Sequence, residues 1–210
     1  MTLDRPLVLA TKNNGKISEF RDLFRNSGIE IKTLDDFGPI PPVIEDGVTF
    51  EDNAVKKAQF TARVLGIPAI ADDSGLTVKA LQGAPGVFSS RYAGEDADDE
   101  ANNRKLLVEM EGVQDRSAAF VCVLVIAVPR GPALVYEGTC EGMIAETPKG
   151  DQGFGYDPLF YYPPFLKTFA QLTRKEKNSI SHRGKAIEEL RGELDRVAIW
   201  LKQRLSEEPF

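Results

Sequence analysis

Cysteine and histidine are scarce in this sequence. Its 210 residues include two cysteines, Cys122 and Cys140, and one histidine, His182. Two cysteines are too few for a disulfide framework and suit a reducing compartment, so we expect the protein to be cytoplasmic. A single histidine excludes a zinc site that needs several of them. The longest apolar run, 118–128, is too short to cross a bilayer, and residues 1–5 lack the apolar stretch of a signal peptide.

An excess of positive charge is also missing. Lysine and arginine number 26 against 32 aspartates and glutamates, which gives a formal net charge of -6. Non-specific nucleic-acid binding rests on clustered basic residues, so an acidic chain is a poor candidate for it. A small anionic substrate remains compatible, because a few local cations hold it. The hydrophobic fraction of 42% is ample for a buried core, and the length fits a single domain, 1–210.

The hydrophobic pattern predicts the fold class. Short apolar runs predict strands, and apolar residues at three- and four-residue spacing predict helices. Strands alternate with helices at the start and a hairpin follows, which predicts an α/β fold with a mixed β-sheet and flanking helices. The expected strands are 7–11, 29–34, 69–72, 117–128 and 133–145, and the expected helices are 16–26, 49–65, 98–110 and 184–205.

A candidate phosphate loop lies between the first strand and the first helix. Backbone N–H groups at a helix N-terminus favour phosphate, and two lysines add charge. It is not a Walker A loop, because Ala10 and Ile17 stand where that motif needs glycine and a hydroxyl. A solvated turn is the alternative. Because we expect Lys16 to lie in an exposed turn, its replacement by alanine should weaken triphosphate binding but change stability by only about 0.5 kcal/mol. The loop comprises Thr11, Lys12, Asn13, Asn14, Gly15 and Lys16.

Two adjacent carboxylates, Asp72 and Asp73, end the apolar strand that begins at Ala69. Burying charge is costly without a partner, and Mg²⁺ is a cation that prefers carboxylates and water. We expect Mg²⁺ to relieve the repulsion between the two carboxylates. A polar turn capped by Ser74 is the alternative. Further carboxylates that could reach the same ion are Glu45, Asp46 and Glu51.

The segment 153–157 alternates glycine with aromatic residues, so a flat ring can approach its backbone. Phe154 or Tyr156 could stack on a base, with Gly155 between them, and Asp157 could accept from a ring N–H. A β-bulge with core aromatics is the alternative.

The segment 177–183 precedes the last expected helix and contains Lys177, Ser181, His182 and Arg183. Its cations could clamp an anionic ligand, and Ser181 could cap the helix. A lone histidine is more often structural than a metal ligand.

These segments form an ordered set of motifs that extends over nearly the whole chain, from Leu7 to about Leu205. The set closely resembles the inosine/xanthosine triphosphate pyrophosphatase family, also called the HAM1 family. The motifs are Thr11-x-Asn-x-Gly-Lys16, Phe50-x-x-Asn-Ala-x-x-Lys-Ala58, Ala71-Asp-Asp-Ser-Gly-Leu76, Gly83-Ala-Pro-Gly86 with Ser89-x-Arg-Tyr92, Gly153-Phe-Gly-Tyr-Asp-Pro158 and Ser181-His-Arg183.

The resemblance implies an elongated, two-lobed homodimer with a central active-site cleft. It implies Mg²⁺-dependent hydrolysis of dITP, ITP and XTP to the monophosphate and pyrophosphate. Asp73 would be the proton acceptor and would bind Mg²⁺ with Glu45. The substrate contacts that it implies are Thr11 to Lys16 and Lys57 for phosphate, Ser74, and, for the nucleoside, Phe154, Gly155, Tyr156, Asp157, Lys177, His182 and Arg183.

Two alternatives stay open. A Maf-type nucleotide pyrophosphatase would share the general fold and chemistry but prefer other bases. The motifs at 154–157 and 182–183 weigh against it. A non-catalytic nucleotide-binding module is the other alternative. The pair Asp72 and Asp73 weighs against that, because clustered carboxylates contribute little to simple binding of a polyanion.

Overall fold

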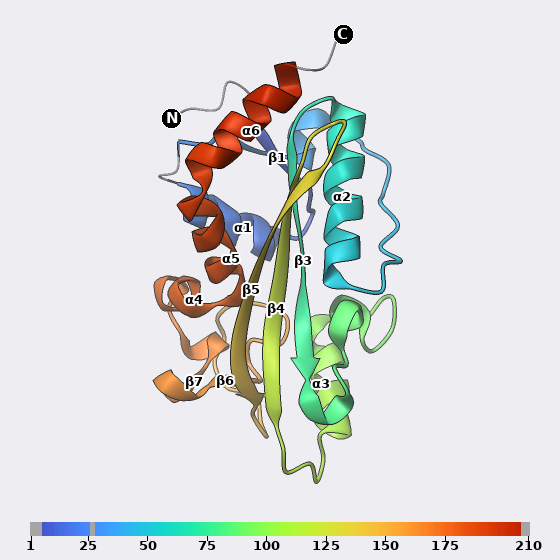
Figure 1. Ribbon diagram of the computed structural model, residues 1–210. Helices are drawn as coiled ribbons and strands as arrows, with labels where there is room; N and C mark the ends of the chain where they lie inside the picture. Colours follow the sequence, from blue (N-terminus) through green and yellow to red (C-terminus); the bar gives the residue numbers. More distant parts are fainter. Residues whose placement is uncertain (1–5, 26–27, 207–210) are drawn as a thin grey trace. The chain divides into compact units, whose positions relative to one another are not determined.

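The computed structural model in Figure 1 describes residues 6–25 and 28–206. The chain forms two compact units. The first unit contains the described residues up to Asp73, the segment Val123–Glu137 and the described residues from Ala186 onward. The second unit contains Ser74–Cys122 and Gly138–Lys185. Within the described ranges, no helix is long and apolar enough to cross a membrane.

The strands of the described residues form one seven-stranded sheet in the order β2-β1-β3-β4-β5-β6-β7. Strand β1 pairs in parallel with β2 and with β3, whereas β6 pairs antiparallel with both β5 and β7. The predicted α/β fold with a mixed sheet is therefore confirmed. The strands are β1 Leu7–Leu9, β2 Ile31–Thr33, β3 Ala69–Val78, β4 Ser117–Ala127, β5 Ala133–Ile144, β6 Phe160–Tyr162 and β7 Lys167–Thr168.

The helices begin at residues that cap them. The Asn13 side chain accepts from the first turn of α1, and Thr49 forms a capping box with Asp52 at the start of α2. The Ser181 hydroxyl accepts from the Gly184 N–H at 3.1 Å, so it caps α5 as expected. The helices are α1 Asn14–Phe24, α2 Phe50–Leu65, α3 Asp99–Glu109, α4 Arg174–Ile180, α5 His182–Gly192 and α6 Leu194–Ser206.

Two predicted elements are wrong by more than a small shift of their ends, and Asn26, where the helix expected over 16–26 ends, lies outside the described residues. Strand β3 does not end at Asp72 but continues to Val78. Ser74 and Gly75 resemble a turn locally, yet the buried residues Leu76 and Val78 hold the chain extended. The helix expected over 184–205 is two helices, α5 and α6, and α5 ends at Gly192, where glycine lowers helix propensity.

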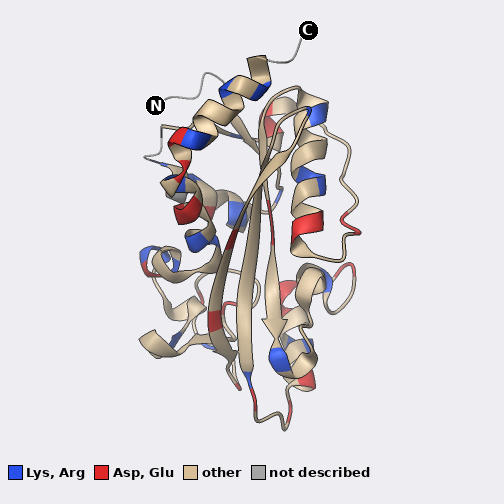
Figure 2. Ribbon diagram, in the orientation of Figure 1, with Lys and Arg blue, Asp and Glu red and all other residues tan. Residues whose placement is uncertain are grey.

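Each unit has its own apolar cluster. In the first unit, alanines of α2 pack against small residues of β1, β3 and β4. In the second unit, Leu106 of α3 and Met110, the residue after α3, belong to one cluster with the aromatic rings of Phe120, Phe160 and Phe169. Figure 2 shows that charged residues are interspersed over the helices, whereas the central strands are mostly uncharged. Asp72 and Asp73 on β3 are therefore exceptional, and both are buried.

Candidate active site

Each buried aspartate of β3 meets its own lysine. The Lys16 ammonium of α1 lies 3.0 Å from Asp72 Oδ2, and the Lys57 ammonium of α2 lies 3.0 Å from Asp73 Oδ1. Successive strand residues point to opposite faces, so the two carboxylates are directed apart. Lys57 Nζ also lies 2.9 Å from Glu45 Oε2. In the described structure the two lysines offset the repulsion between the aspartates, and the expectation that Mg²⁺ relieves it stays a prediction.

This charged cluster changes the acidity of its members. Burial raises the pKa of the Asp73 carboxyl above its ordinary value, and Lys57 and Lys16 offset only part of that rise. Burial alone would lower the pKa of Lys57, but the carboxylates of Asp73, Asp72 and Glu45 raise it above its ordinary value. A buried carboxyl with a raised pKa is a stronger proton acceptor than an exposed one, which suits general-base chemistry.

Asn53 is a further member of this site, and its place in the α2 motif predicted no role for it. It is 1% exposed and lies one helical turn before Lys57 on α2. Its Nδ2 donates to Asp73 Oδ2 at 3.2 Å, and its Oδ1 accepts from the Gly47 N–H at 2.8 Å. Asn53 therefore holds the second oxygen of Asp73 and anchors the loop that carries Glu45. The spacing of Asn53 and Lys57 on one helix face was the signal that could have revealed it.

The candidate phosphate loop leads into α1. Asn13 Oδ1 accepts from the Lys16 N–H at 3.0 Å, and the Asn13 N–H donates to Thr11 Oγ1 at 3.2 Å. Lys12 and Asn14 are exposed. Lys16 is not in an exposed turn, because its side chain is 15% exposed and pairs with a fully buried carboxylate. The expected stability change of about 0.5 kcal/mol on its removal is therefore too small.

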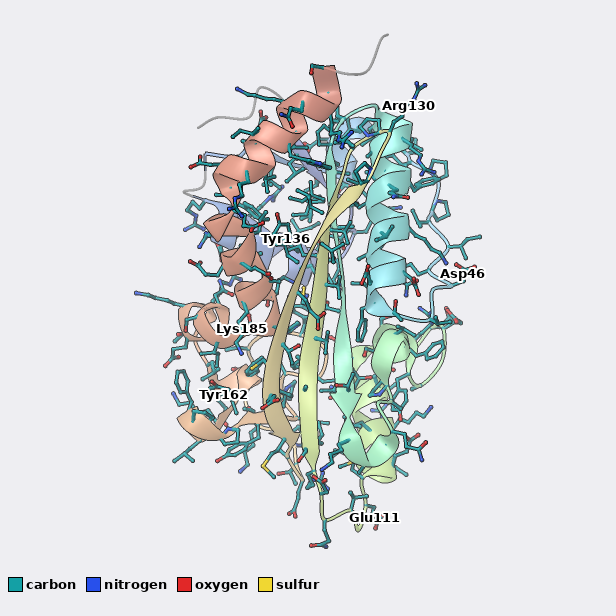
Figure 3. The ribbon with its side chains drawn as sticks, viewed as in Figure 1. Asp46, Glu111, Arg130, Tyr136, Tyr162 and Lys185 are labelled. Atoms are coloured by element: carbon teal, nitrogen blue, oxygen red, sulfur yellow. The ribbon has the colours of Figure 1, made fainter. Side chains whose placement is uncertain are left out.

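Glu45 and Asp73 match Mg²⁺ in the chemistry of their oxygen ligands, but they do not form a complete ligand set. Among the described residues, no group of three or more histidines, cysteines, aspartates or glutamates is arranged to hold a metal ion. Glu45 and Asp73 nevertheless converge on one cation, the Lys57 ammonium. Asp46 is not brought to this point: it is exposed on the loop before α2 (Figure 3) and pairs with Lys56 at 2.6 Å. Mg²⁺ commonly takes one or two protein carboxylates with water and substrate phosphate, so the chemistry of Glu45 and Asp73 is compatible with that ion.

In the second unit, the loop over 153–157 is built around Asp157. Asp157 Oδ2 accepts from the Phe154 N–H at 2.9 Å and from Lys177 Nζ at 2.6 Å. Lys177 Nζ also lies 4.8 Å from the centroid of the Phe154 ring. Gly153 has φ +82°, and a Cβ there would lie 2.0 Å from Asp157 Oδ2. The loop therefore presents one aromatic ring beside a buried, paired ammonium.

Arg183 contacts both the Phe154 ring and Ser74. Its guanidinium is buried, donates to Ser74 Oγ at 3.0 Å and lies 5.9 Å from the centroid of the Phe154 ring. His182 is 5% exposed and stacks on Phe120 at 4.8 Å between ring centroids. The structure thus brings together Ser74, Phe154 and Arg183, and it packs His182 into the aromatic core.

Tyr156 does not offer a stacking face. Its ring is buried in the core of the second unit, and its hydroxyl donates to the Ser89 carbonyl at 2.9 Å. The expectation that Tyr156 could stack on a base is therefore wrong. Phe154, which is half-buried, remains the aromatic residue of this loop with an accessible ring.

The fold and the two sets of charged side chains define an α/β protein with an open mixed sheet. A model of the Ham1 family matches residues 7–193, and the chain belongs to that family. It is 58% identical over 202 residues to a dITP/XTP pyrophosphatase of Syntrophobacter fumaroxidans, covering 96% of this chain and 87% of that protein. A dITP/XTP pyrophosphatase of Desulfotalea psychrophila is 57% identical, covering 96% and 91%. The solved structure of a HAM1 protein from Coxiella burnetii has a TM-score of 0.85 and 44% identity, covering 93% and 100%.

Proposed function

We propose that this protein hydrolyses non-canonical purine nucleoside triphosphates, dITP, ITP and XTP, to the monophosphate and pyrophosphate. The observation that carries the proposal is that relatives 58% and 57% identical over 96% of the chain are both named dITP/XTP pyrophosphatase. The geometry supports it, because the described residues include a carboxylate and lysine cluster and an aromatic ring beside two buried cations.

We assign the triphosphate to the carboxylate and lysine cluster. Lys16 and Lys57 supply positive charge against the phosphates, together with the N-terminus of α1 after Asn13. Asp73 accepts a proton from the water that attacks the α-phosphate, and burial suits it to this role. Glu45 and Asp73 would hold Mg²⁺, which when bound neutralises part of the triphosphate charge. Catalysis then rests mainly on positioning and electrostatics.

We assign the purine to the loop over 153–157. The Phe154 ring offers a stacking face, and Lys177 and Arg183 are donors beside it. Hypoxanthine and xanthine carry an accepting oxygen at C6, whereas adenine carries a donating amino group there. Cationic donors therefore match the former bases and oppose the latter. A site that hydrogen-bonds its substrate rejects a mismatched analogue by on the order of 10⁴-fold.

Two properties complete the proposal. We infer a homodimer, which rests on the family resemblance, and light scattering at micromolar concentration tests it. We also infer that the protein works in the cytoplasm, because its two thiols, Cys122 and Cys140, are buried and form no disulfide.

The decisive experiment measures pyrophosphate release from ITP, XTP, ATP, GTP and TTP, with and without Mg²⁺. We expect kcat/KM for ITP and XTP to exceed that for ATP and GTP strongly, and activity to require Mg²⁺. Comparable kcat/KM for ATP and ITP would contradict the proposal, and preference for TTP would favour a Maf-type enzyme. Nucleotide binding without any pyrophosphate release would show a non-catalytic module.

A further inference from the structure

Helix α3 holds both backbone polar groups of one residue in the base-side loop. The Gly155 N–H donates to Asp99 Oδ2 at 2.6 Å, and Asn103 Nδ2 donates to the Gly155 carbonyl at 2.9 Å. Asp99 and Asn103 are four residues apart, so they lie on one face of the helix. We call this arrangement of Asp99, Asn103 and Gly155 the α3 clamp.

The clamp acts on the residue that follows the stacking ring. Gly155 comes directly after Phe154 and has φ +62°. The neighbouring residues are also tied: the Phe154 N–H donates to Asp157, and the Tyr156 hydroxyl donates to the Ser89 carbonyl. Loss of the two hydrogen bonds to the Gly155 backbone would free the chain between Phe154 and Tyr156. The Phe154 ring would then lose its fixed position relative to Lys177.

The support for the clamp is itself well anchored. Asn102 is buried, donates to the Ser90 carbonyl at 3.1 Å and accepts from the Ala93 N–H at 2.8 Å. Lys105 Nζ donates to the Tyr92 carbonyl at 2.7 Å. One part of α3 therefore fixes the helix to the segment 90–93, while Asp99 and Asn103 reach the base-side loop. Such outer contacts hold a functional side chain in its working geometry.

We propose that Asp99 and Asn103 are positioning residues that set purine affinity and selectivity by holding Gly155, and thereby the Phe154 ring. The inference rests on the proposed function, since it assigns Phe154 to the purine. Each side chain acts through its hydrogen bond to the backbone of Gly155. A misplacement of about 1 Å in a positioned group costs on the order of 10²-fold.

Asp99 and Asn103 should tolerate different substitutions. Within the described residues, Asn103 Oδ1 makes no hydrogen bond, so the polar role of this side chain is donation by Nδ2 to the carbonyls of Gly155 and Asp99. Asn103→Asp keeps the shape but turns that donor into an oxygen facing two carbonyl oxygens. Asp99→Asn, in contrast, keeps an oxygen that can accept from the Gly155 N–H.

The test compares steady-state kinetics with ITP and ATP for the wild-type chain and these variants. We expect Asn103→Asp to raise the KM for ITP about tenfold or more and to lower the ITP-to-ATP ratio of kcat/KM, with kcat for ITP changed less than threefold. Asp99→Ala should act in the same direction, and Asp99→Asn should recover most of the lost affinity. The matched control is Glu100→Gln. Glu100 is exposed on the same helical turn, and within the described residues its side chain pairs with Arg104.

A second readout follows the clamp directly. We expect the Gly155 amide to exchange its hydrogen at least tenfold faster in Asp99→Ala than in the wild-type chain, as measured by NMR. An unchanged exchange rate would overturn the clamp, as would an unchanged ITP KM in Asn103→Asp when the wild type prefers ITP. A wild-type chain without that preference would count against the proposed function instead, and the exchange rate would still decide the clamp.

Discussion

Replacing Lys57 with methionine removes the cation on which Glu45 and Asp73 converge while keeping an unbranched side chain. Breaking a buried ion pair by removing one partner costs about 3–5 kcal/mol, whereas exposed pairs are worth about 0–1 kcal/mol. The Asp73 side chain is 11% exposed, so its pair belongs to the first class, but Glu45 at 40% adds little. Because Asn53 still donates to Asp73, we expect a loss near the lower limit, about 3 kcal/mol.

Lys56→Met is the matched control, since Lys56 is the preceding residue of α2. Its partner Asp46 is 70% exposed and Lys56 itself 44%, so this loss should stay below about 1 kcal/mol. Urea unfolding measures both changes through the fluorescence of the single tryptophan, Trp200, which lies on α6 in the same unit as Lys57.

The same variants test the metal assignment without any catalysis. If Glu45 and Asp73 hold Mg²⁺, the ion at a hundredfold excess over its dissociation constant stabilises the fold by about 2.7 kcal/mol. In Lys57→Met no ammonium competes for these carboxylates, so Mg²⁺ should restore most of the lost stability. Equal free energies of unfolding for the two variants would refute the ion-pair argument. Equal stabilisation of both by Mg²⁺ would refute the assignment of the ion to these carboxylates.

Three further predictions concern other buried groups. Lys16→Ala should lower the free energy of unfolding by about 3 kcal/mol, because the fully buried Asp72 carboxylate loses its ion-pair partner, and it should weaken ITP binding. Unchanged stability in urea unfolding would contradict the pairing. Asp73→Asn should lower kcat for ITP by about 10² to 10⁴-fold while ITP still binds, and a variant that keeps more than about a tenth of kcat rules out the general base. Burial raises the pKa of Cys140 to about 11, and Cys122 is also buried. Neither thiol should therefore react with an aromatic disulfide reagent until urea unfolds the chain. Prompt reaction of the native protein would be inconsistent with this burial.

The sequence predicted those elements whose signal is local. The apolar run from 118 and the turn near 131 identify the hairpin of β4 and β5, and Thr49 with Asp52 identifies the start of α2. The continuation of β3 escaped prediction because Ser74 and Gly75 favour a turn on their own. Burial of Leu76 beyond them outweighs that preference.

The site residues also divide into those with a local sequence signal and those without one. Motifs identified Lys57, Asp73 and Lys177 as candidates, and the structure places each of them in a buried ion pair. Asn53, Asp99 and Asn103 escaped prediction because their partners lie 20, 56 and 52 residues away in the chain. An asparagine or aspartate on a helix surface has no local feature that separates a solvated side chain from one that holds a distant loop.

The two glycines of the base-side loop should differ in a saturation library selected for nucleotide hydrolysis. At Gly153 any side chain both strains the backbone at φ +82° and overlaps the Asp157 carboxylate. At Gly155 the φ of +62° falls in the region that asparagine and aspartate tolerate, and a Cβ there meets nothing within 4 Å. Position 153 should therefore recover glycine alone, whereas position 155 should accept asparagine. Two neighbouring glycines in one motif thus carry different kinds of sequence constraint, one of volume and one of backbone handedness.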